Sequence, residues 1–238
     1  MSIPESKIKR AWITAGQGKL WGTKGTYSSV AYEQLPSLPP VAPSFAWMES
    51  VPDRNYGCTL DSDDNKLGSL FAIEAELKKL GFQLPEEFST FIRDRNLQRR
   101  IPSCTACVLD LSNAVTELPG FPGSYVVRFM NDSQCCILWY LLFQPLLPVR
   151  ILATACFIER DIFKAMEYMT EEDRLLEYGE VLKDSCICAE SFGEFICRFG
   201  LENMIWYATH DGQSLSPIEQ RYLVRAQKAE RGAGRVAS

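Results

Sequence analysis

The stretch CCILWYLLF, from Cys135 to Phe143, is the feature that most limits how this chain can fold. A strand in which every residue is apolar needs cover on both faces, and this places it in the interior of a sheet. Because side chains alternate across a strand, we expect Trp139 and Phe143 on one face and Tyr140 on the other. The same alternation predicts that the thiols of Cys135 and Cys136 point apart, as buried small hydrophobes rather than as a joint metal site.

Three further segments have the composition of strands. They are CTACVLDL (104–111), SYVVRFM (124–130) and VRILATAC (149–156). The connections NDSQ and QPLLP are short, and short connections join antiparallel neighbours, whereas a parallel pair needs a crossover of about a dozen residues or more. We therefore expect a largely antiparallel sheet, a meander of about four or more strands.

Helical patterns occur on both sides of these strands. Leu70, Ile73, Leu77 and Leu80 recur at helical spacing before Gly81, and Pro85 opens a second helix. That second helix carries Phe88, Phe91 and Ile92 on one face. Later, the capping boxes Ser191/Glu194 and Ser216/Glu219 open two more helices, the first with a stripe of Phe192, Phe195, Ile196 and Phe199. The predicted fold class is α+β, a sheet flanked by helices, with an extended N-terminal arm.

The ends of the chain differ from its middle. Residues 1–45 lack helical periodicity and close on the proline-rich LPSLPPVAP, which predicts an N-terminal extension with a linker. The prolines suit either a spacer or a PxxP ligand for an SH3-type partner, and GQGKLWGTKGTYSSV has room for a hairpin. We expect one domain over 46–228 and a flexible tail over 229–238, because the tail is small, polar and glycine-bearing.

Composition excludes several classes of function. With 46% hydrophobic and 23% charged residues the chain is ordinary for a globular protein, and its net charge of −5 argues against nucleic-acid binding. We expect no signal peptide, because the N-terminus has no apolar run of sufficient length. We expect no membrane anchor, because Gln144, Pro145, Pro148 and Arg150 interrupt the most apolar region. Nine cysteines, an odd number, predict reduced thiols and a cytoplasmic location, with the oligomeric state open.

Charged residues supply the candidate binding positions. Residues 161–184 are the most acidic stretch, and Glu171, Glu172 and Asp173 suit either a solvated helical face or a basic partner. Arg95 and Arg99, in FIRDRNLQRR, suit either a helix C-terminus or the grip on a phosphate or an acidic peptide. Asp132 and Gln134, in the NDSQ loop, suit either a tight turn or an exposed contact.

The thiols provide the alternative chemistry. Cys104 and Cys107 form a CxxC and Cys186 and Cys188 form a CxC, so four thiolates could make a zinc site, although buried inert thiols are the better account of them. His210, the single histidine, is placed to cap a helix, or less simply to act as the base for a cysteine. The chain has no GxSxG, Walker A, GxGxxG or HExxH motif, which makes an enzyme less expected without excluding one, since paired carboxylates leave no local signature, and we expect no cofactor.

The order of these elements resembles the SMI1/KNR4 family, also called the SUKH superfamily, over roughly residues 66–225. The likeness rests on three motifs. They are Leu84 and Pro85 before Phe88 and Phe91, the F-x-N-D-x-Q loop of Phe129, Asn131, Asp132 and Gln134 leading to Trp139, and the helix of Phe192, Phe195, Arg198 and Phe199.

The resemblance implies an α+β fold without catalytic residues. It also implies a protein-binding module, since members of the family look like toxin-immunity proteins or regulators of cell-wall synthesis. We therefore expect a non-enzymatic, cytoplasmic module that binds a protein partner through the rim of the sheet and the acidic stretch, the latter suited to a basic partner. The alternative is a zinc or thiol protein that uses Cys104, Cys107, Cys186 and Cys188.

Overall fold

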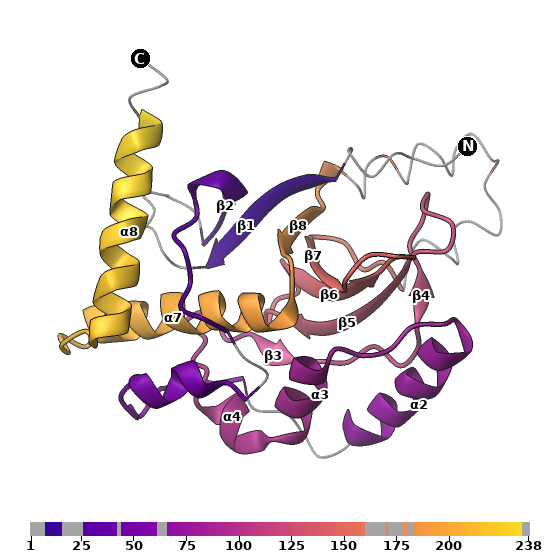
Figure 1. Cartoon of the computed structure of the whole chain (residues 1–238), viewed down its shortest axis with the longest axis horizontal. Coiled ribbons are helices and arrows are strands. Elements are labelled where there is room, and N and C mark those ends of the chain that lie inside the picture. Colours follow the sequence, from indigo (N-terminus) through magenta and orange to yellow (C-terminus); the bar gives the residue numbers. More distant parts are fainter. Residues whose placement is uncertain are drawn as a thin grey trace.

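The computed structural model describes residues 8–15, 26–41, 44–60, 66–159, 170, 179 and 183–234, with the backbone alone at 66–68 and 228–234. Within these residues an eight-stranded sheet forms the centre of the molecule (Figure 1). Its order is β2-β1-β8-β7-β6-β5-β3, and β4 also pairs with β5. The pair β1–β8 is parallel, and the other described pairs are antiparallel. The strands are β1 (Lys9–Ala15), β2 (Tyr27–Ala31), β3 (Val108–Leu109), β4 (Thr116–Glu117), β5 (Tyr125–Asn131), β6 (Leu138–Phe143), β7 (Arg150–Thr154) and β8 (Cys186–Ala189).

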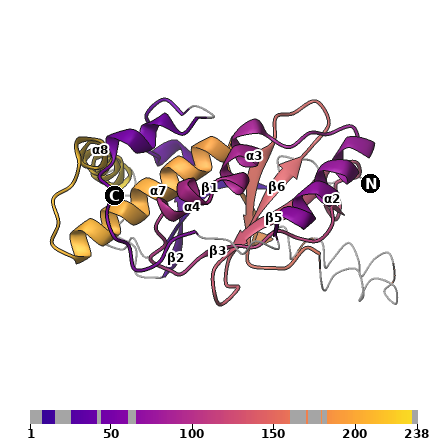
Figure 2. The ribbon, with the colours of Figure 1, turned by 90° about the horizontal axis from the view of Figure 1, so that it is seen from below.

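Helices cover one face of the sheet. Seen from below, α2, α3, α4 and α7 lie across the same side of the strands, and α8 stands at the end of α7 (Figure 2). The described helices are α2 (Lys66–Lys79), α3 (Glu86–Arg93), α4 (Arg95–Arg99), α7 (Phe192–His210) and α8 (Pro217–Gly234), with 3-10 turns η2 (Tyr32–Gln34) and η3 (Ala46–Ser50). The fold is α+β and largely antiparallel, as the sequence predicts. Among the described residues, none of the helices combines the length and the apolar character that a membrane crossing requires.

Strand β6 lies inside the sheet, between β5 and β7, and is buried along its whole length. Trp139, Leu141 and Phe143 belong to the core on the helix side, and Leu138, Tyr140 and Leu142 belong to the core on the opposite face. On the helix side, Phe88 meets Phe129 and Phe192 with ring centroids 5.9 and 5.1 Å apart. The predicted alternation of this strand is confirmed.

The two cysteines before β6 are placed differently from the prediction. The strand begins at Leu138, and Cys135 closes a turn by donating its N–H to the carbonyl of Asp132 at 3.0 Å. Cys135 has a φ of +55°, and Cys136 is exposed rather than buried. The Asp132 carboxylate accepts the N–H groups of Cys136 and Ile137, and these bonds organise the turn before β6. The prediction of two buried strand cysteines is wrong.

The sequence predicts that residues 1–45 form an N-terminal extension. In the structure, the described part of this segment contributes strands to the sheet. β1 and β2 pair with each other, β1 pairs with β8, and Trp12 is buried at 1% exposure against Phe195. The proline-rich segment also contacts the domain, because Arg198 donates to the carbonyl of Pro36 at 3.0 Å. Its described residues, which end at 41, therefore do not run as a free spacer.

The helix boundaries follow their sequence signals. α2 ends just before Gly81, whose φ of +83° suits glycine at the end of a helix. Ser191 accepts the N–H of Glu194 at 3.1 Å, and Glu219 accepts the N–H of Ser216 at 2.6 Å, so both predicted capping residues act at helix starts. The helix α8 runs to Gly234, so the predicted flexible tail of 229–238 is helical over 229–234.

Candidate binding site at one end of the sheet

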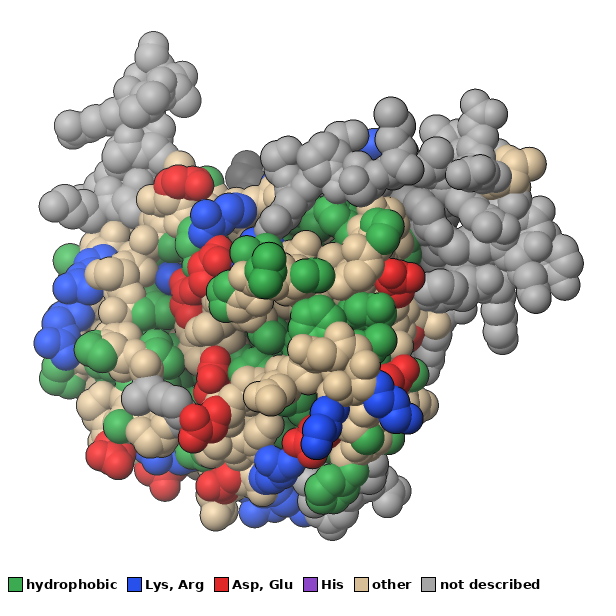
Figure 3. All heavy atoms as spheres, turned by 45° about the vertical axis from the view of Figure 1, so that its right-hand side comes forward, with side chains coloured by type: hydrophobic (Ala, Val, Ile, Leu, Met, Phe, Trp, Pro, Cys, Tyr) green, Lys and Arg blue, Asp and Glu red, His purple; other side chains and the backbone are tan. Residues whose placement is uncertain are grey.

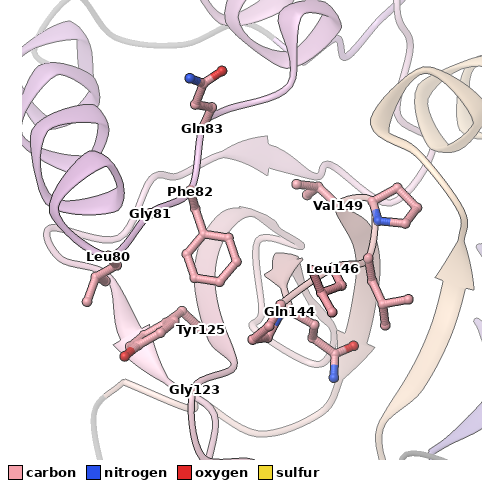
Figure 4. A pocket seen from close by; sticks show the side chains of 12 residues that line it. Leu80, Gly81, Phe82, Gln83, Gly123, Tyr125, Gln144, Leu146 and Val149 are labelled. Carbon is pink, nitrogen blue, oxygen red and sulfur yellow. The ribbon is translucent and has the colours of Figure 1, made fainter.

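Three segments of the chain meet in a groove at one end of the sheet, which we call the sheet-end groove. They are the α2–α3 connection (80–83), the start of β5 with Gly123 before it, and the β6–β7 turn (144–149). Tyr125 of β5 pairs with Phe143 of β6, so these chain ends lie at the same edge. The groove encloses about 630 Å³, and Figure 4 shows Phe82 and Tyr125 opposite Val149. This volume lies within the range of about 300–1,000 Å³ that is usual for binding pockets.

Phe82 forms the aromatic wall of the groove. The turn at Gly81 reverses the chain after α2, and the N–H of Phe82 then donates to the carbonyl of Leu77 at 2.9 Å. The Phe82 ring meets Tyr125 and Phe143 edge to face, with centroids 5.8 Å apart in each pair. These contacts hold the ring in place, so the wall is formed before any partner binds.

The β6–β7 turn forms the opposite wall. The N–H of Leu147 donates to the carbonyl of Gln144 at 3.2 Å, and the buried Gln144 amide accepts from Arg150 and donates to Ser124. The turn places Leu146 at a φ of +64°, a conformation that costs a leucine on the order of 1–3 kcal/mol. Its side chain is 104% exposed, and Leu147 beside it is 42% exposed. The turn thus presents apolar side chains to solvent at a conformational cost.

The groove has no formal charge among its described residues. They are Leu80, Gly81, Phe82, Gln83, Gly123, Tyr125, Gln144, Pro145, Leu146, Leu147, Pro148 and Val149. In Figure 3 the right-hand side of Figure 1 is turned forward, and on the face shown hydrophobic side chains reach the surface among acidic and basic ones. An uncharged lining desolvates at lower cost than a charged one, so the groove suits an apolar, uncharged segment.

The predicted contact residue Asp132 lies at the other end of the β5–β6 pair, in the turn before β6. It is 4% exposed, and its carboxylate accepts from the N–H of Cys136 at 2.6 Å and from the Tyr27 hydroxyl at 2.9 Å. Asp132 therefore organises a tight turn, which is the first of the two alternatives, and it is not an exposed contact residue. Gln134 in the same turn is exposed.

The other predicted binding residues are not brought to the groove. Arg95 and Arg99 are exposed on α4, where Asp94 caps the helix by accepting the N–H of Asn96 at 2.8 Å. Of the flanking arginines, Arg93 pairs with Glu74 at 2.5 Å and Arg100 donates to the carbonyl of Met48 at 2.6 Å. Glu171, Glu172 and Asp173 lie outside the described residues.

The four cysteines of the predicted zinc or thiol site lie in two different parts of the fold, a loop and a strand. Cys104 and Cys107 lie in the loop before β3, whereas Cys186 and Cys188 lie in β8. Burial raises the pKa of Cys104 and of Cys186 to about 12, and it also raises the pKa of Cys107 and Cys188. The described residues contain no group of three or more Cys, His, Asp or Glu that could hold a metal ion. His210, in the last turn of α7, stacks on Trp206 with centroids 4.8 Å apart.

A buried polar network on α7 was not predicted from the sequence. Glu202 is 2% exposed and accepts hydrogen bonds from Trp12 Nε1, Thr14 Oγ1 and the Tyr222 hydroxyl, each at 2.9 Å. Burial raises the pKa of Glu202, while these donors and the nearby Arg198 oppose the rise. The network joins β1 to α7 and α8. The available signal was Arg198 and Glu202, two charged residues four positions apart in the mostly apolar middle of this helix.

Comparisons with known proteins supply no counterpart for this site. No family model, no curated protein and no solved structure matches the chain. The likeness to the SMI1/KNR4 family therefore stays a prediction from the sequence motifs, and the function of the groove is argued from its geometry.

Proposed function

We propose that this chain is a non-enzymatic protein-binding module that holds an uncharged, apolar segment of a protein in the sheet-end groove. The observation that carries the proposal is Leu146, fully exposed at a positive φ on the rim of that groove. Burying a leucine side chain contributes about 1.5–3 kcal/mol, and a few anchors of this kind dominate most interfaces. A leucine held in an unfavourable backbone conformation and in water is well suited to that role.

Two sequence features support the same function. The resemblance to the SMI1/KNR4 family implies partner binding, either in toxin immunity or in cellular regulation, and both roles need a docking surface. The expectation of a basic partner belongs to the acidic stretch around Glu171 and is kept as a proposal for that segment alone. The neutral groove favours apolar contact instead.

The thiol alternative has less support from the described residues. A reactive cysteine acts as the thiolate, and burial keeps the pKa of Cys104 and Cys186 at about 12. Thiols of this kind remain protonated at neutral pH. Among the residues that the structure describes, no observation favours a zinc or thiol protein over partner binding.

The test is a pull-down from extract of the source cells with tagged wild type, Leu146→Asn and Val224→Asn. Val224 is a matched control, because it is also exposed and apolar but lies on α8 outside the groove. We expect a protein that wild type and V224N retain and that L146N retains about tenfold less, corresponding to about 1.4 kcal/mol. Equal retention by all three variants would count against the groove as the docking surface.

A further inference from the structure

Another cavity lies between α8 and the proline-rich segment, and we call it the α8 cavity. It encloses about 250 Å³. Two arginines hold the segment in place, because Arg198 donates to the carbonyl of Pro36 at 3.0 Å and Arg225 donates to the carbonyl of Ser37 at 3.2 Å. These bonds fix one wall of the cavity, so a ligand that binds there orders little additional chain. The described lining residues are Ser37, Leu38, Pro39, Pro40, Leu201, Ile218, Arg221, Tyr222 and Arg225.

The polar side chains of the α8 cavity supply hydrogen-bond donors. Arg221 and Arg225 lie one turn apart on α8, and a guanidinium group carries only donors. Arg225 Nη1 donates to the Ser37 hydroxyl at 2.6 Å, so this oxygen accepts one bond and its own proton remains to be donated. Tyr222 is already engaged, since its hydroxyl donates to Glu202 at 2.9 Å. Donors therefore converge on a cavity whose described lining contains no acidic side chain.

The two arginines of the α8 cavity have no carboxylate partner among the described residues. Arg221 forms no hydrogen bond or ion pair with them, and the bonds of Arg225 go to Ser37. Glu219, on the same helix, is bound by Arg54 instead. Like charges four residues apart on a helix repel each other, so an anion bound between them relieves that repulsion. The net charge of −5 opposes an anion only weakly here, because salt screens exposed charges over about 10 Å at 0.1 M.

We propose that the α8 cavity binds a small phosphate monoester. The phosphoryl oxygens accept from Arg221, Arg225 and the Ser37 hydroxyl, and the organic group packs on Leu38 and Ile218. A phosphate monoester carries a charge of about −1.5 to −2 at pH 7, which balances two guanidinium groups, whereas a carboxylate balances one. Guanidinium groups also match the geometry of phosphate oxygens.

The size of the cavity limits the class of ligand. Pockets for drug-sized ligands enclose about 300–1,000 Å³, and the α8 cavity lies just below that range. It therefore suits a phosphate group with a short organic body. The α8 cavity and the sheet-end groove share no lining residue, so this site goes beyond the docking function and does not depend on it.

The experiment is isothermal titration calorimetry of the full chain with phenyl phosphate, inorganic phosphate and benzoate. We expect phenyl phosphate to bind most tightly, because it alone combines a phosphate group with an apolar ring. Arg221→Gln should weaken its binding by at least about tenfold, as for loss of a charge-assisted hydrogen bond. Arg93→Gln is the matched control, since it removes the same charge from an exposed residue of α3 outside the cavity. Thermal unfolding checks that both variants fold.

Three outcomes overturn the phosphate site. The first is a wild type that does not bind phenyl phosphate. The second is an equal loss of affinity in R221Q and R93Q, which would mean that overall charge alone attracts the ligand. The third is benzoate or inorganic phosphate bound as tightly as phenyl phosphate, which would mean that the cavity does not recognise the phosphate group and the apolar body together. None of these results changes the pull-down with L146N, so the site and the docking function fail separately.

Discussion

Asp132 is a polar loop residue of the kind that often contacts a partner, but in this protein its side chain stabilises the fold. Sequence alone leaves two readings of the NDSQ loop, an exposed contact or a tight turn. Burial decides between them, because the Asp132 carboxylate accepts from two backbone N–H groups and from the Tyr27 hydroxyl. A carboxylate in this position accepts hydrogen bonds from donors that would otherwise have no partner.

Replacing Asp132 by alanine should destabilise the protein by about 2–3 kcal/mol, because buried donors are left unsatisfied. The measurement is urea denaturation followed by fluorescence. Ser133→Ala is the matched control, since Ser133 is the exposed neighbour in the same turn. A D132A variant as stable as S133A would contradict this role.

Glu219 carries a pH-dependent contribution to stability. Burial alone would raise the pKa of Glu219, but its bonds with Arg54 and Ser216 outweigh burial and hold that pKa below its ordinary value. Arg54 Nη2 donates to the carboxylate at 2.9 Å, and the Ser216 N–H donates at 2.6 Å. A lowered carboxyl pKa means that the folded protein binds fewer protons than the unfolded chain near this pH.

This contribution is present above the unfolded pKa of about 4.3 and is lost as the pH falls through the folded value. We therefore expect the stability of wild type to fall more steeply than that of Glu219→Gln between pH 6 and pH 3. At neutral pH, E219Q should be less stable by about 1.5–3 kcal/mol, the usual worth of a hydrogen bond to a charged group. Parallel stability curves for the two proteins in urea titrations would contradict the assignment.

At the scale of elements, strong periodic signals predicted helices and strands well. β5, β6 and β7 and the helices α2, α3, α7 and α8 fall where apolar spacing and capping residues place them. Several elements were missed, among them β1 (Lys9–Ala15) and β8 (Cys186–Ala189). β8 has four residues, too few for an alternating pattern to stand out, and β1 is half polar because its first residues are exposed. Each depends on neighbours distant in sequence or outside its own local pattern: β1 pairs with β2 and β8, and β8 pairs with β7 and β1.

A chain that begins at residue 46 should therefore fail to fold cooperatively. It lacks Trp12, Val30 and Phe45 from the core, and it exposes β8 as an unpaired edge. A milder form is Trp12→Ala, expected to cost about 3–5 kcal/mol. The partly exposed Trp206→Ala is its control and should cost much less. Thermal and urea unfolding test both, and a fully cooperative 46–238 chain would show that β1 and β2 are dispensable.

At the scale of the whole molecule, the helices on one face of the sheet decide where binding can occur. The aromatic core between α3, α7 and the sheet is closed, as Phe88, Phe129 and Phe192 are fully buried. One end of the sheet is different, because three connections meet there and form the sheet-end groove. Connections lie outside the packed layers, so binding residues gather on them.

The sequence by itself determined the α+β class, the two-sided burial of β6 and most helix boundaries, because these depend on spacing within a few residues. Tertiary structure alone decided the partners of those elements. It placed β1 beside β8, although more than 170 residues separate the paired Lys9 and Cys186, and it joined Trp12 to Glu202. It also brought residues 80–83, 123–125 and 144–149 into one groove. Such contacts leave no local pattern, because their free energy is gained only when distant segments pack together.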